Sequence, residues 1–335
     1  MKKIFSIFCA VLIIVLAFSG CGNGQVPEAT EAPTPQATEF IGTDIKIGAL
    51  NGPTGMGISK LIKDSEDGLT ANRYQVELFS APTDITGLLI NGELDIAALP
   101  TNLAATLYNK TNGGVKLLAL NTLGVLYVME KGDTVHSIQD LEGKKIYSSG
   151  QASTPEYALN YVLEQNHITC EVEYFATHAE LAAQALAGNA DILLIPEPFV
   201  STILAKEAGF RIAVDFNAAW DEACGGEILF SMGCLAVRTE FAQNNKAALD
   251  KFVEEYTASV EYVNANPSEA GALIAQYGIV ASPELAQAAI PNCNMVTITD
   301  SEMKTKTIPY IQMLFENNAA SVGGKIPGED FYYKK

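Results

Sequence analysis

The chain has 335 residues, of which 48% are hydrophobic and 18% charged, and its formal net charge at pH 7 is −18. This composition is typical of a globular protein with a sizeable core, and the excess of acidic residues disfavours nucleic acid and anionic lipid headgroups as partners. After the first 43 residues, roughly 290 residues remain, which is enough for two lobes of ordinary domain size.

Residues 1–20 form a predicted secretory signal peptide. Lys2 and Lys3 precede an uncharged run over residues 4–18, which is shorter than the ~20 apolar residues that a membrane-spanning helix needs. The run ends at Ser19-Gly20-Cys21, which is similar to the bacterial lipobox, although Phe18 stands where that motif usually has Leu. We therefore expect a bacterial lipoprotein that is cleaved before Cys21 and carries acyl chains, such as palmitate, on that cysteine. The alternative is an ordinary secreted protein in which Cys21 has no such role.

Residues 21–43 are expected to form a disordered tether that begins at the lipidated cysteine. Beyond Cys21 this segment contains Pro27, Pro33 and Pro35 and has no basic residue. Such a sequence cannot bury enough apolar surface to order itself. As a coil of about 22 residues it would span roughly 25 Å. The folded part is therefore expected on the extracellular face of the cell membrane, held there by the lipid anchor.

Four cysteines follow the tether, and they are Cys170, Cys224, Cys234 and Cys293. Because none of them forms a CxxC spacing, we expect no metal site. In an oxidising exterior, Cys224 and Cys234 could form a disulfide across a short loop. Free buried thiols are the equal alternative, and the sequence does not choose between the two.

A faint internal repeat indicates two lobes. Residues 76–80 (Val-Glu-Leu-Phe-Ser) match residues 172–176 (Val-Glu-Tyr-Phe-Ala) at an offset of 96. The same offset relates Gly92 to Gly188 and Pro100 to Pro196. A duplicated unit of this kind predicts two similar lobes.

Each copy of the repeat alternates strands with helices, which predicts mainly parallel sheets. In the first copy we expect strands over 44–50, 74–80 and 95–99 and helices over 56–65, 83–91 and 102–110. In the second copy we expect strands over 144–148, 171–175 and 191–195 and helices over 154–165, 178–187 and 198–206. The remaining chain is expected to return to the first lobe with a strand near 229–238 and helices over 241–266, 267–277, 283–289 and 301–315.

The turns after matching strands are the candidate binding loops, because ligands of open α/β sheets bind beyond the carboxyl ends of the strands. Two lobes that face each other would enclose a cleft between these loops. The predicted ligand-binding residues in them are Asn51, Gly52, Pro53, Thr54, Gly55, Thr101, Asn102, Gly150, Ser153, Thr154 and Glu197. Several of them open predicted helices, whose N–H groups favour a polar or anionic group. The alternative for each such side chain is a helix N-cap, worth about 1 kcal/mol of stability.

Two runs carry a resemblance to a known family. Residues 188–199 (Gly-Asn-Ala-Asp-Ile-Leu-Leu-Ile-Pro-Glu-Pro-Phe) are similar to that family's small-Gly-x-x-Asp-apolar-Pro-Glu-Pro run, and residues 140–146 (Asp-Leu-Glu-Gly-Lys-Lys-Ile) are similar to its entry into the second lobe. Trp220 ahead of Gly225-Gly226 adds to the match. Taken in order, residues 44 to about 333 resemble the nitrate, sulfonate and taurine binding proteins of ABC importers, a family that also includes thiamine-precursor binders.

The resemblance implies an α/β, type II periplasmic-binding-protein fold with two crossovers between the lobes, near 123–129 and 227–235. The first lobe would then comprise residues 44–125 and 231–335, and the second lobe residues 126–230. It also implies an extracellular protein, expected to be a monomer without cofactor or catalytic activity. This protein would capture a small organic solute between its lobes and deliver it to an ABC permease and its ATPase.

Two ligand chemistries stay open. Arg73, Arg211 and Arg238 all lie outside the predicted binding loops, so a multiply charged oxyanion is disfavoured, whereas a singly charged sulfonate or taurine-like solute fits. A cationic or aromatic heterocycle, such as a thiamine precursor, would instead need carboxylates and aromatic rings. The candidates for that role are Glu197, Asp221, Tyr127, Tyr147 and Trp220.

Two other functions are consistent with the same fold. One is an enzyme of the thiamine-pyrimidine-synthase type, but His136, His167 and His178 have no Ser or Cys motif beside them and are expected on the surface. The other is a ligand sensor without transport, which a permease and an ATPase encoded next to the gene would argue against.

Overall fold

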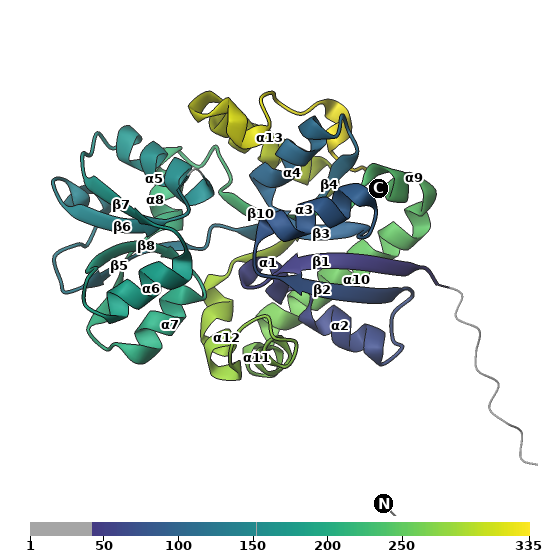
Figure 1. Cartoon of the computed structure of the whole chain (residues 1–335), viewed down its shortest axis with the longest axis horizontal. Coiled ribbons are helices and arrows are strands. Elements are labelled where there is room, and N and C mark those ends of the chain that lie inside the picture. Colours follow the sequence, from purple (N-terminus) through teal and green to yellow (C-terminus); the bar gives the residue numbers. More distant parts are fainter. Residues whose placement is uncertain (1–41, 152) are drawn as a thin grey trace, which may run out of the picture. The chain divides into compact units, whose positions relative to one another are not determined.

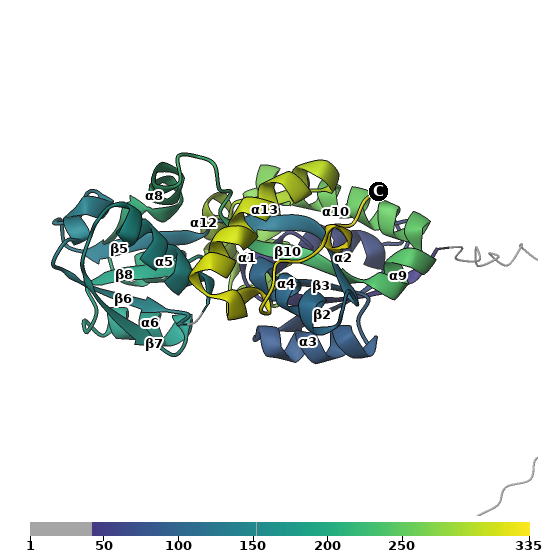
Figure 2. The ribbon, with the colours of Figure 1, turned by 90° about the horizontal axis from the view of Figure 1, so that it is seen from above.

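The computed structural model describes residues 42–151 and 153–335, which are shown in Figure 1. The predicted signal peptide, Cys21 and the tether up to residue 41 lie outside the described residues. Figure 2 shows that the two sheets of the described chain lie in separate lobes. We call the lobe with the six-stranded sheet the first lobe, and the lobe with the five-stranded sheet the second lobe.

The sheet of the first lobe has the strand order β11-β4-β10-β3-β1-β2. Its strands are β1 (Asp44–Leu50), β2 (Arg73–Phe79), β3 (Ile96–Pro100), β4 (Val115–Leu123), β10 (Ser231–Arg238) and β11 (Met295–Ile298). Strands β1, β2 and β3 pair in parallel, whereas β10 runs antiparallel between β3 and β4. Residues Ile96 to Leu99 of β3 are all buried, as expected for a central strand with both faces covered.

Four helices connect the parallel strands of the first lobe, and they are α1 (Pro53–Met56), α2 (Ser59–Glu66), α3 (Pro82–Asn91) and α4 (Thr101–Lys110). Helix α3 begins with Pro82 in its first turn and ends at Gly92, whose φ of 81° allows the left-handed C-cap. The helix predicted over 56–65 is in fact divided into α1 and α2. Gly57, which follows α1, packs closely on α10 (Lys246–Ala265), since a Cβ there would lie 2.9 Å from Val260.

The sheet of the second lobe has the strand order β7-β6-β8-β5-β9. Its strands are β5 (Leu126–Lys131), β6 (Lys145–Ser149), β7 (Glu171–Phe175), β8 (Ile192–Pro196) and β9 (Phe210–Asp215). The helices around it are α5 (Thr154–Gln165), α6 (His178–Leu186), α7 (Phe199–Lys206) and α8 (Phe216–Ala223). Strand β6 pairs in parallel with β7 and β8, as the repeat predicts. Strands β4, β5, β9 and β11 and helix α8 lie outside the elements that the repeat predicted.

The C-terminal part of the chain covers the first lobe with α9 (Thr239–Asn244), α10 (Lys246–Ala265), α11 (Pro267–Gln276), α12 (Pro283–Ala289) and α13 (Asp300–Asn317). The sequence predicted one helix over 241–266, and the structure has two. Asn245, with φ of −128° and ψ of 38°, separates α9 from α10. Short 3₁₀ turns at Ile290–Asn292, Ala319–Val322 and Glu329–Phe331 complete the segment.

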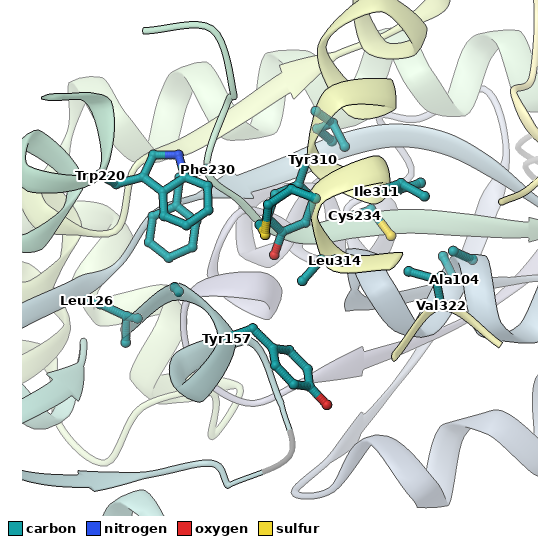
Figure 3. Packing of buried hydrophobic residues seen from close by; sticks show 14 of the residues in the cluster. Ala104, Leu126, Tyr157, Trp220, Phe230, Cys234, Tyr310, Ile311, Leu314 and Val322 are labelled. Carbon is teal, nitrogen blue, oxygen red and sulfur yellow. The ribbon is translucent and has the colours of Figure 1, made fainter. Parts of the chain in front are cut away.

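The chain passes from the first sheet to the second between Leu123 and Leu126, and it returns between Ala223 and Ser231. One core cluster of buried side chains extends across both passages (Figure 3). In it, the ring of Trp220 stacks on Phe230 with centroids 4.6 Å apart, and Trp220 Nε1 donates to the Ile228 carbonyl at 2.7 Å. Tyr310 of α13 lies against the edge of Trp220, with centroids 6.3 Å apart. The second passage is therefore packed into a shared core.

Within residues 42–151 and 153–335, no helix has both the length and the apolar character that crossing a bilayer would require. Cys170, Cys224, Cys234 and Cys293 are all free thiols. Cys224 and Cys234, left open between a disulfide and free thiols by the sequence, are thus not paired in this structure. Cys224 Sγ lies 3.5 Å from the Ile228 carbonyl oxygen, and Cys234 is fully buried in β10.

Candidate functional site

A cleft with a volume of about 720 Å³ is lined by side chains of both lobes. Its first-lobe walls are one face of α3, one face of α4 and the start of β10, and its second-lobe wall is the beginning of α5 and α6. The lining residues are Pro82, Thr83, Thr86, Ile90, Pro100, Asn102, Leu103, Thr106, Leu107, Lys110, Ser153, Thr154, Pro155, His178 and Met232. A smaller hollow of about 410 Å³ over β1, β2 and α3 belongs to the first lobe alone.

Four helices present their N-terminal ends to this cleft. Helices α3 and α4 follow β2 and β3 of the first sheet, and α5 and α6 follow β6 and β7 of the second. The carboxyl ends of parallel strands lie at one edge of a sheet, so the helices that follow begin at that edge. A helix N-terminus has N–H groups without an intrahelical partner and carries the positive end of the helix dipole. In α6 one of these groups, the Glu180 N–H, donates to Thr177 Oγ1 at 3.1 Å. The cleft therefore has a polar floor that favours hydrogen-bond acceptors and negative charge.

His178, the first residue of α6, is the ionisable ring in the cleft wall. Its Nδ1 lies 2.5 Å from Oγ of Ser149, the last residue of β6, and its ring is 5.8 Å from that of Phe199. Burial lowers the pKa of His178 to about 4, so the ring is neutral near pH 7. The sequence predicted a surface position for His178, and the structure shows a half-buried ring in the wall of the cleft. His178 is the first residue of α6, and that helix begins at the cleft. The pattern of residues along the sequence does not show which helices begin there.

The charges around the cleft are unbalanced. Among the described residues that line it, Lys110 is the charged side chain, and no aspartate or glutamate takes part. This contrasts with the whole chain, whose 39 acidic residues outnumber 21 basic ones. Arginine is likewise absent from the described lining, as the sequence predicts. The cleft is therefore suited to acceptor groups of low charge.

Three of the sequence-predicted residues, Asn102, Ser153 and Thr154, line the cleft. Ser153 Oγ donates to the Gly150 carbonyl at 2.6 Å, and Gly150 has a φ of 78°, so this turn shapes the entry to α5. Thr101 lies just beneath the cleft surface at 1% exposure, where its hydroxyl is 2.8 Å from that of Ser231.

The first predicted loop, Asn51 to Gly55, lies outside the cleft lining. The Gly52 N–H donates to the Ile279 carbonyl at 3.2 Å, and the Thr54 carbonyl accepts from Asn121 Nδ2 at 2.9 Å. A Cβ at Gly55 would lie 2.2 Å from the Leu50 carbonyl oxygen. Asn51 is exposed and Pro53 is the first residue of the short helix α1. The contacts of this loop are thus with the protein itself.

Glu197 and Tyr127 make contacts between the lobes through Asn292. Glu197 is 1% exposed, and its carboxylate accepts from the Ser201 N–H, the Ser201 hydroxyl and Asn292 Nδ2 at 3.0–3.1 Å. Burial raises the pKa of Glu197 despite these hydrogen bonds. The Tyr127 hydroxyl donates to the Asn292 carbonyl at 3.0 Å, and burial raises its pKa. Both side chains are therefore occupied by the lobe interface.

The aromatic and acidic residues considered for a cationic heterocycle are not gathered around the cleft. Trp220 is fully buried in the shared core, and Asp221 is exposed on α8. Tyr147 packs against Phe175 with centroids 6.1 Å apart, while Lys145 lies over its ring. None of these residues lines the described cleft.

Sequence reasoning missed the faces of α3 and α4 and the ring of His178. It considered only turns, whereas the lining residues of α3 recur at Pro82, Thr86 and Ile90, and those of α4 at Asn102, Thr106 and Lys110. This spacing of four places them on one face of each helix. This spacing can be read from the sequence. However, the sequence pattern of a helix face that lines a cleft is the same as that of a face exposed to bulk water.

A family model and several solved structures match this chain. A family model described as menaquinone biosynthesis matches residues 67–290. An ABC transporter structure from Parabacteroides distasonis has 25% sequence identity and a TM-score of 0.74, covering 87% of this chain and 99% of that chain. The periplasmic aliphatic sulphonate-binding protein SsuA from Escherichia coli has 14% identity and a TM-score of 0.67, covering 87% of this chain and 93% of that chain. No curated protein sequence matches significantly.

The periplasmic nitrate-binding protein NrtA from Synechocystis has 12% identity and a TM-score of 0.53, covering 78% of this chain and 75% of that chain. At such identities the sulphonate and nitrate binders establish the fold alone. They confirm the two-lobed fold of ABC importer binding proteins that the sequence resemblance implied. The chain has this binding-protein fold. Because the family model matches more than half of its residues, the chain belongs to the menaquinone-biosynthesis family.

Proposed function

We propose that the chain is the substrate-binding component of an ABC importer and that it captures a small organic anion in the cleft between its lobes. The proposal rests on the hydrogen-bonding groups that line the cleft and on the absence of carboxylates from its described lining. Four helix N-termini, the polar side chains Asn102, Ser153 and Thr154, and a neutral imidazole meet at a cleft whose described lining has no carboxylate. This chemistry favours a sulfonate or carboxylate over a cationic thiamine precursor.

His178 is a hydrogen-bond donor to the anion in this proposal. Ser149 is 1% exposed, and His178 Nδ1 is the partner that the described residues provide for its hydroxyl. A buried hydroxyl without an acceptor is costly, so we assign its proton to the bond with Nδ1. The neutral ring then carries its own proton on Nε2, which is the nitrogen left for the ligand.

Export and anchoring belong to the same proposal. The predicted signal peptide and Cys21 would place the mature protein on the outer face of the cell membrane, where it would pass its solute to a permease driven by an ATPase. Replacement of Cys21 by Ser should release the protein from the membrane fraction. Recovery of unacylated wild-type protein in the soluble fraction alone would contradict the lipid anchor.

Ligand identity can be tested by thermal unfolding against a panel of solutes. The panel contains nitrate, taurine, alkanesulfonates, matched carboxylates, thiamine, its pyrimidine precursor and riboflavin. A true ligand at a hundred times its Kd stabilises the folded state by about 2.7 kcal/mol. We expect stabilisation by organic anions, and weaker stabilisation with His178→Ala. Stabilisation by thiamine or its precursor alone would overturn the anion assignment.

An enzyme is the second candidate function, because a neutral histidine bonded to a serine could act as a general base and because of the description of the matched family model. We propose that the chain is not catalytic, since a dissociable solute needs only the donors described above. Incubation of the protein with each solute that binds it, followed by mass spectrometry, tests this choice. Recovery of the solute unchanged is expected, and a product that is lost with His178→Ala would establish an enzyme instead.

A further inference from the structure

The cleft continues as a groove along the first lobe, beyond the helix N-termini. Its lining residues span positions 82 to 90 of α3 and positions 102 to 110 of α4. Each span covers eight residue steps, which corresponds to about 12 Å along a helix at 1.5 Å per residue. The first turns of both helices share the cleft lining with Ser153 and His178, and Lys110 is the last residue of α4 in that lining. The cleft is therefore longer than a compact anion such as nitrate needs.

The outer part of this groove differs in chemistry from the inner part. Ile90 and Leu107 line it, and Ile90 is 49% exposed although it is a large apolar side chain. The two threonine hydroxyls nearby are already used, since Thr86 Oγ1 donates to the Thr83 carbonyl at 2.9 Å and Thr106 Oγ1 lies 3.1 Å from the carbonyls of Asn102 and Ser321. The outer groove thus offers apolar contact, with Lys110 as the charged side chain at its end.

We infer that the groove between α3 and α4 binds the apolar chain of the ligand, so that the captured solute is an organic anion with an extended chain rather than a compact anion. The inference rests on the proposed function, because the anionic head is assigned to the inner, hydrogen-bonding part of the cleft. The occupant is the chain of the same small molecule, since inner and outer parts are continuous within one cavity. Burial of exposed Ile90 by that chain supplies a hydrophobic gain.

The inference predicts a specific dependence on chain length. An extended chain advances about 1.2 Å per bond, as an extended backbone does, so a groove of about 12 Å accommodates roughly ten bonds. Each methylene that is half covered by the groove should tighten binding about twofold, and a fully covered one about fourfold. Affinity should therefore rise from ethanesulfonate to about octanesulfonate and then level off.

Isothermal titration calorimetry of the full mature chain with straight-chain sulfonates of two to ten carbons tests the inference, with the matched carboxylates and primary alcohols as parallel series. Ile90→Glu places a carboxylate in the groove and should reduce the gain per methylene to less than half. Ile308→Glu is the matched control, because Ile308 is 42% exposed on α13, outside the cleft lining, and it should keep the full gain.

Four outcomes are informative. A rise in affinity with chain length that Ile90→Glu alone reduces would support the inference. Equal affinity at all chain lengths would overturn the inference and leave the anion-binding function standing. A rise that both glutamate variants keep would place the chain elsewhere and also overturn it. If alcohols bind as tightly as sulfonates, or if no sulfonate or carboxylate binds, the proposed function itself fails and the inference falls with it.

Discussion

The two loops that follow the first strand of each repeat have the same place in their lobes and different surroundings. In the first lobe, Gly52 has a φ of 88°, and its N–H is bonded to Ile279 of the C-terminal segment. In the second lobe, Gly150 has a φ of 78°, and Ser153 and Thr154 after it line the cleft. The repeat thus predicts where a loop lies, whereas the part of the chain outside the repeat decides whether a ligand can reach it.

The largest expected effect concerns Gly55, a buried residue of the first loop. Gly55→Ala places a Cβ 2.2 Å from the Leu50 carbonyl oxygen, which is a backbone atom that cannot move aside cheaply. We expect a loss of more than about 3 kcal/mol in the free energy of unfolding. Urea denaturation followed by circular dichroism measures it.

Gly87→Ala is the matched control for this substitution. Gly87 lies inside α3, and a Cβ there meets nothing within 4 Å. The variant should gain about 0.5–1 kcal/mol, because alanine costs less backbone entropy in a helix than glycine. Equal stability of the Gly55→Ala variant and the wild type would show that the first loop is not tightly packed.

The second prediction uses the titratable ring beside the open loop. Burial lowers the pKa of His178 from 6.5 to about 4, so between these values the unfolded chain binds more protons than the folded one. Stability associated with His178 is therefore complete above pH 6.5 and is lost as the pH falls towards 4, by up to about 3 kcal/mol.

Urea denaturation of the wild type and of His178→Gln between pH 4 and 7.5 isolates this contribution, because other acid-sensitive groups are common to both proteins. The wild type should lose more stability than the variant as the pH falls. Parallel pH profiles for the two proteins would show that His178 remains accessible to solvent in the folded state.

Much of the fold could be predicted from the sequence, because strand and helix periods are local and the repeat supplies their order. The strands over 44–50 and 191–195 and the helix over 154–165 lie within a residue of β1, β8 and α5. Strands β4 and β5 were missed because they have no counterpart in the repeat, and both pair antiparallel with their neighbours.

The candidate site was harder to predict, because it depends on contacts between residues far apart in the chain. From the sequence alone, Trp220 could belong to a hydrophobic core or to a binding site. Its stacking on Phe230 shows that it belongs to the core. Glu197 lies in a motif that fits either role, and its bonds to Ser201 and Asn292 show a contact between the lobes. His178 could be assigned to the cleft only after the two lobes were placed together.

The third prediction compares equivalent threonines in the two loops. Thr154 lines the cleft and Thr54 does not. Thr154→Ala should weaken binding of an organic anion by about 1 kcal/mol if a neutral hydrogen bond is lost, and by up to about 3 kcal/mol if the bond is to a charged group. Thr54→Ala should leave the affinity unchanged.

Calorimetric affinities of both threonine variants, measured together with their unliganded melting temperatures, separate binding from stability. Each threonine lies in the first turn of a helix, α5 for Thr154 and α1 for Thr54, so a lower melting temperature alone would report a loss of folding stability rather than of binding. If Thr54→Ala weakened binding and Thr154→Ala did not, the ligand would have to bind at the first loop, and the difference between the two loops would be reversed.

The smallest expected effect belongs to Lys110, which lies at the outer end of the groove and is exposed. Its backbone lies eight residues along α4 from Asn102, which corresponds to about 12 Å, so the attraction of its ammonium for an anionic head is expected to act through solvent and to be screened at a Debye length of about 8–10 Å at ordinary salt. Lys110→Met should therefore weaken anion binding by less than about 1 kcal/mol at low salt and by nothing measurable at high salt.

Lys206→Met is the matched control for this substitution. Lys206 is an exposed lysine of α7 outside the cleft lining, so its replacement should have no effect at either salt concentration. Titrations of both variants at about 20 mM and 500 mM sodium chloride separate the two lysines, since only a charge that faces the ligand gives a salt-dependent difference. A loss with Lys110→Met that persists at high salt would mean that the ligand's anionic group contacts Lys110 directly, and the head would then bind at the outer end of the groove rather than at the helix N-termini.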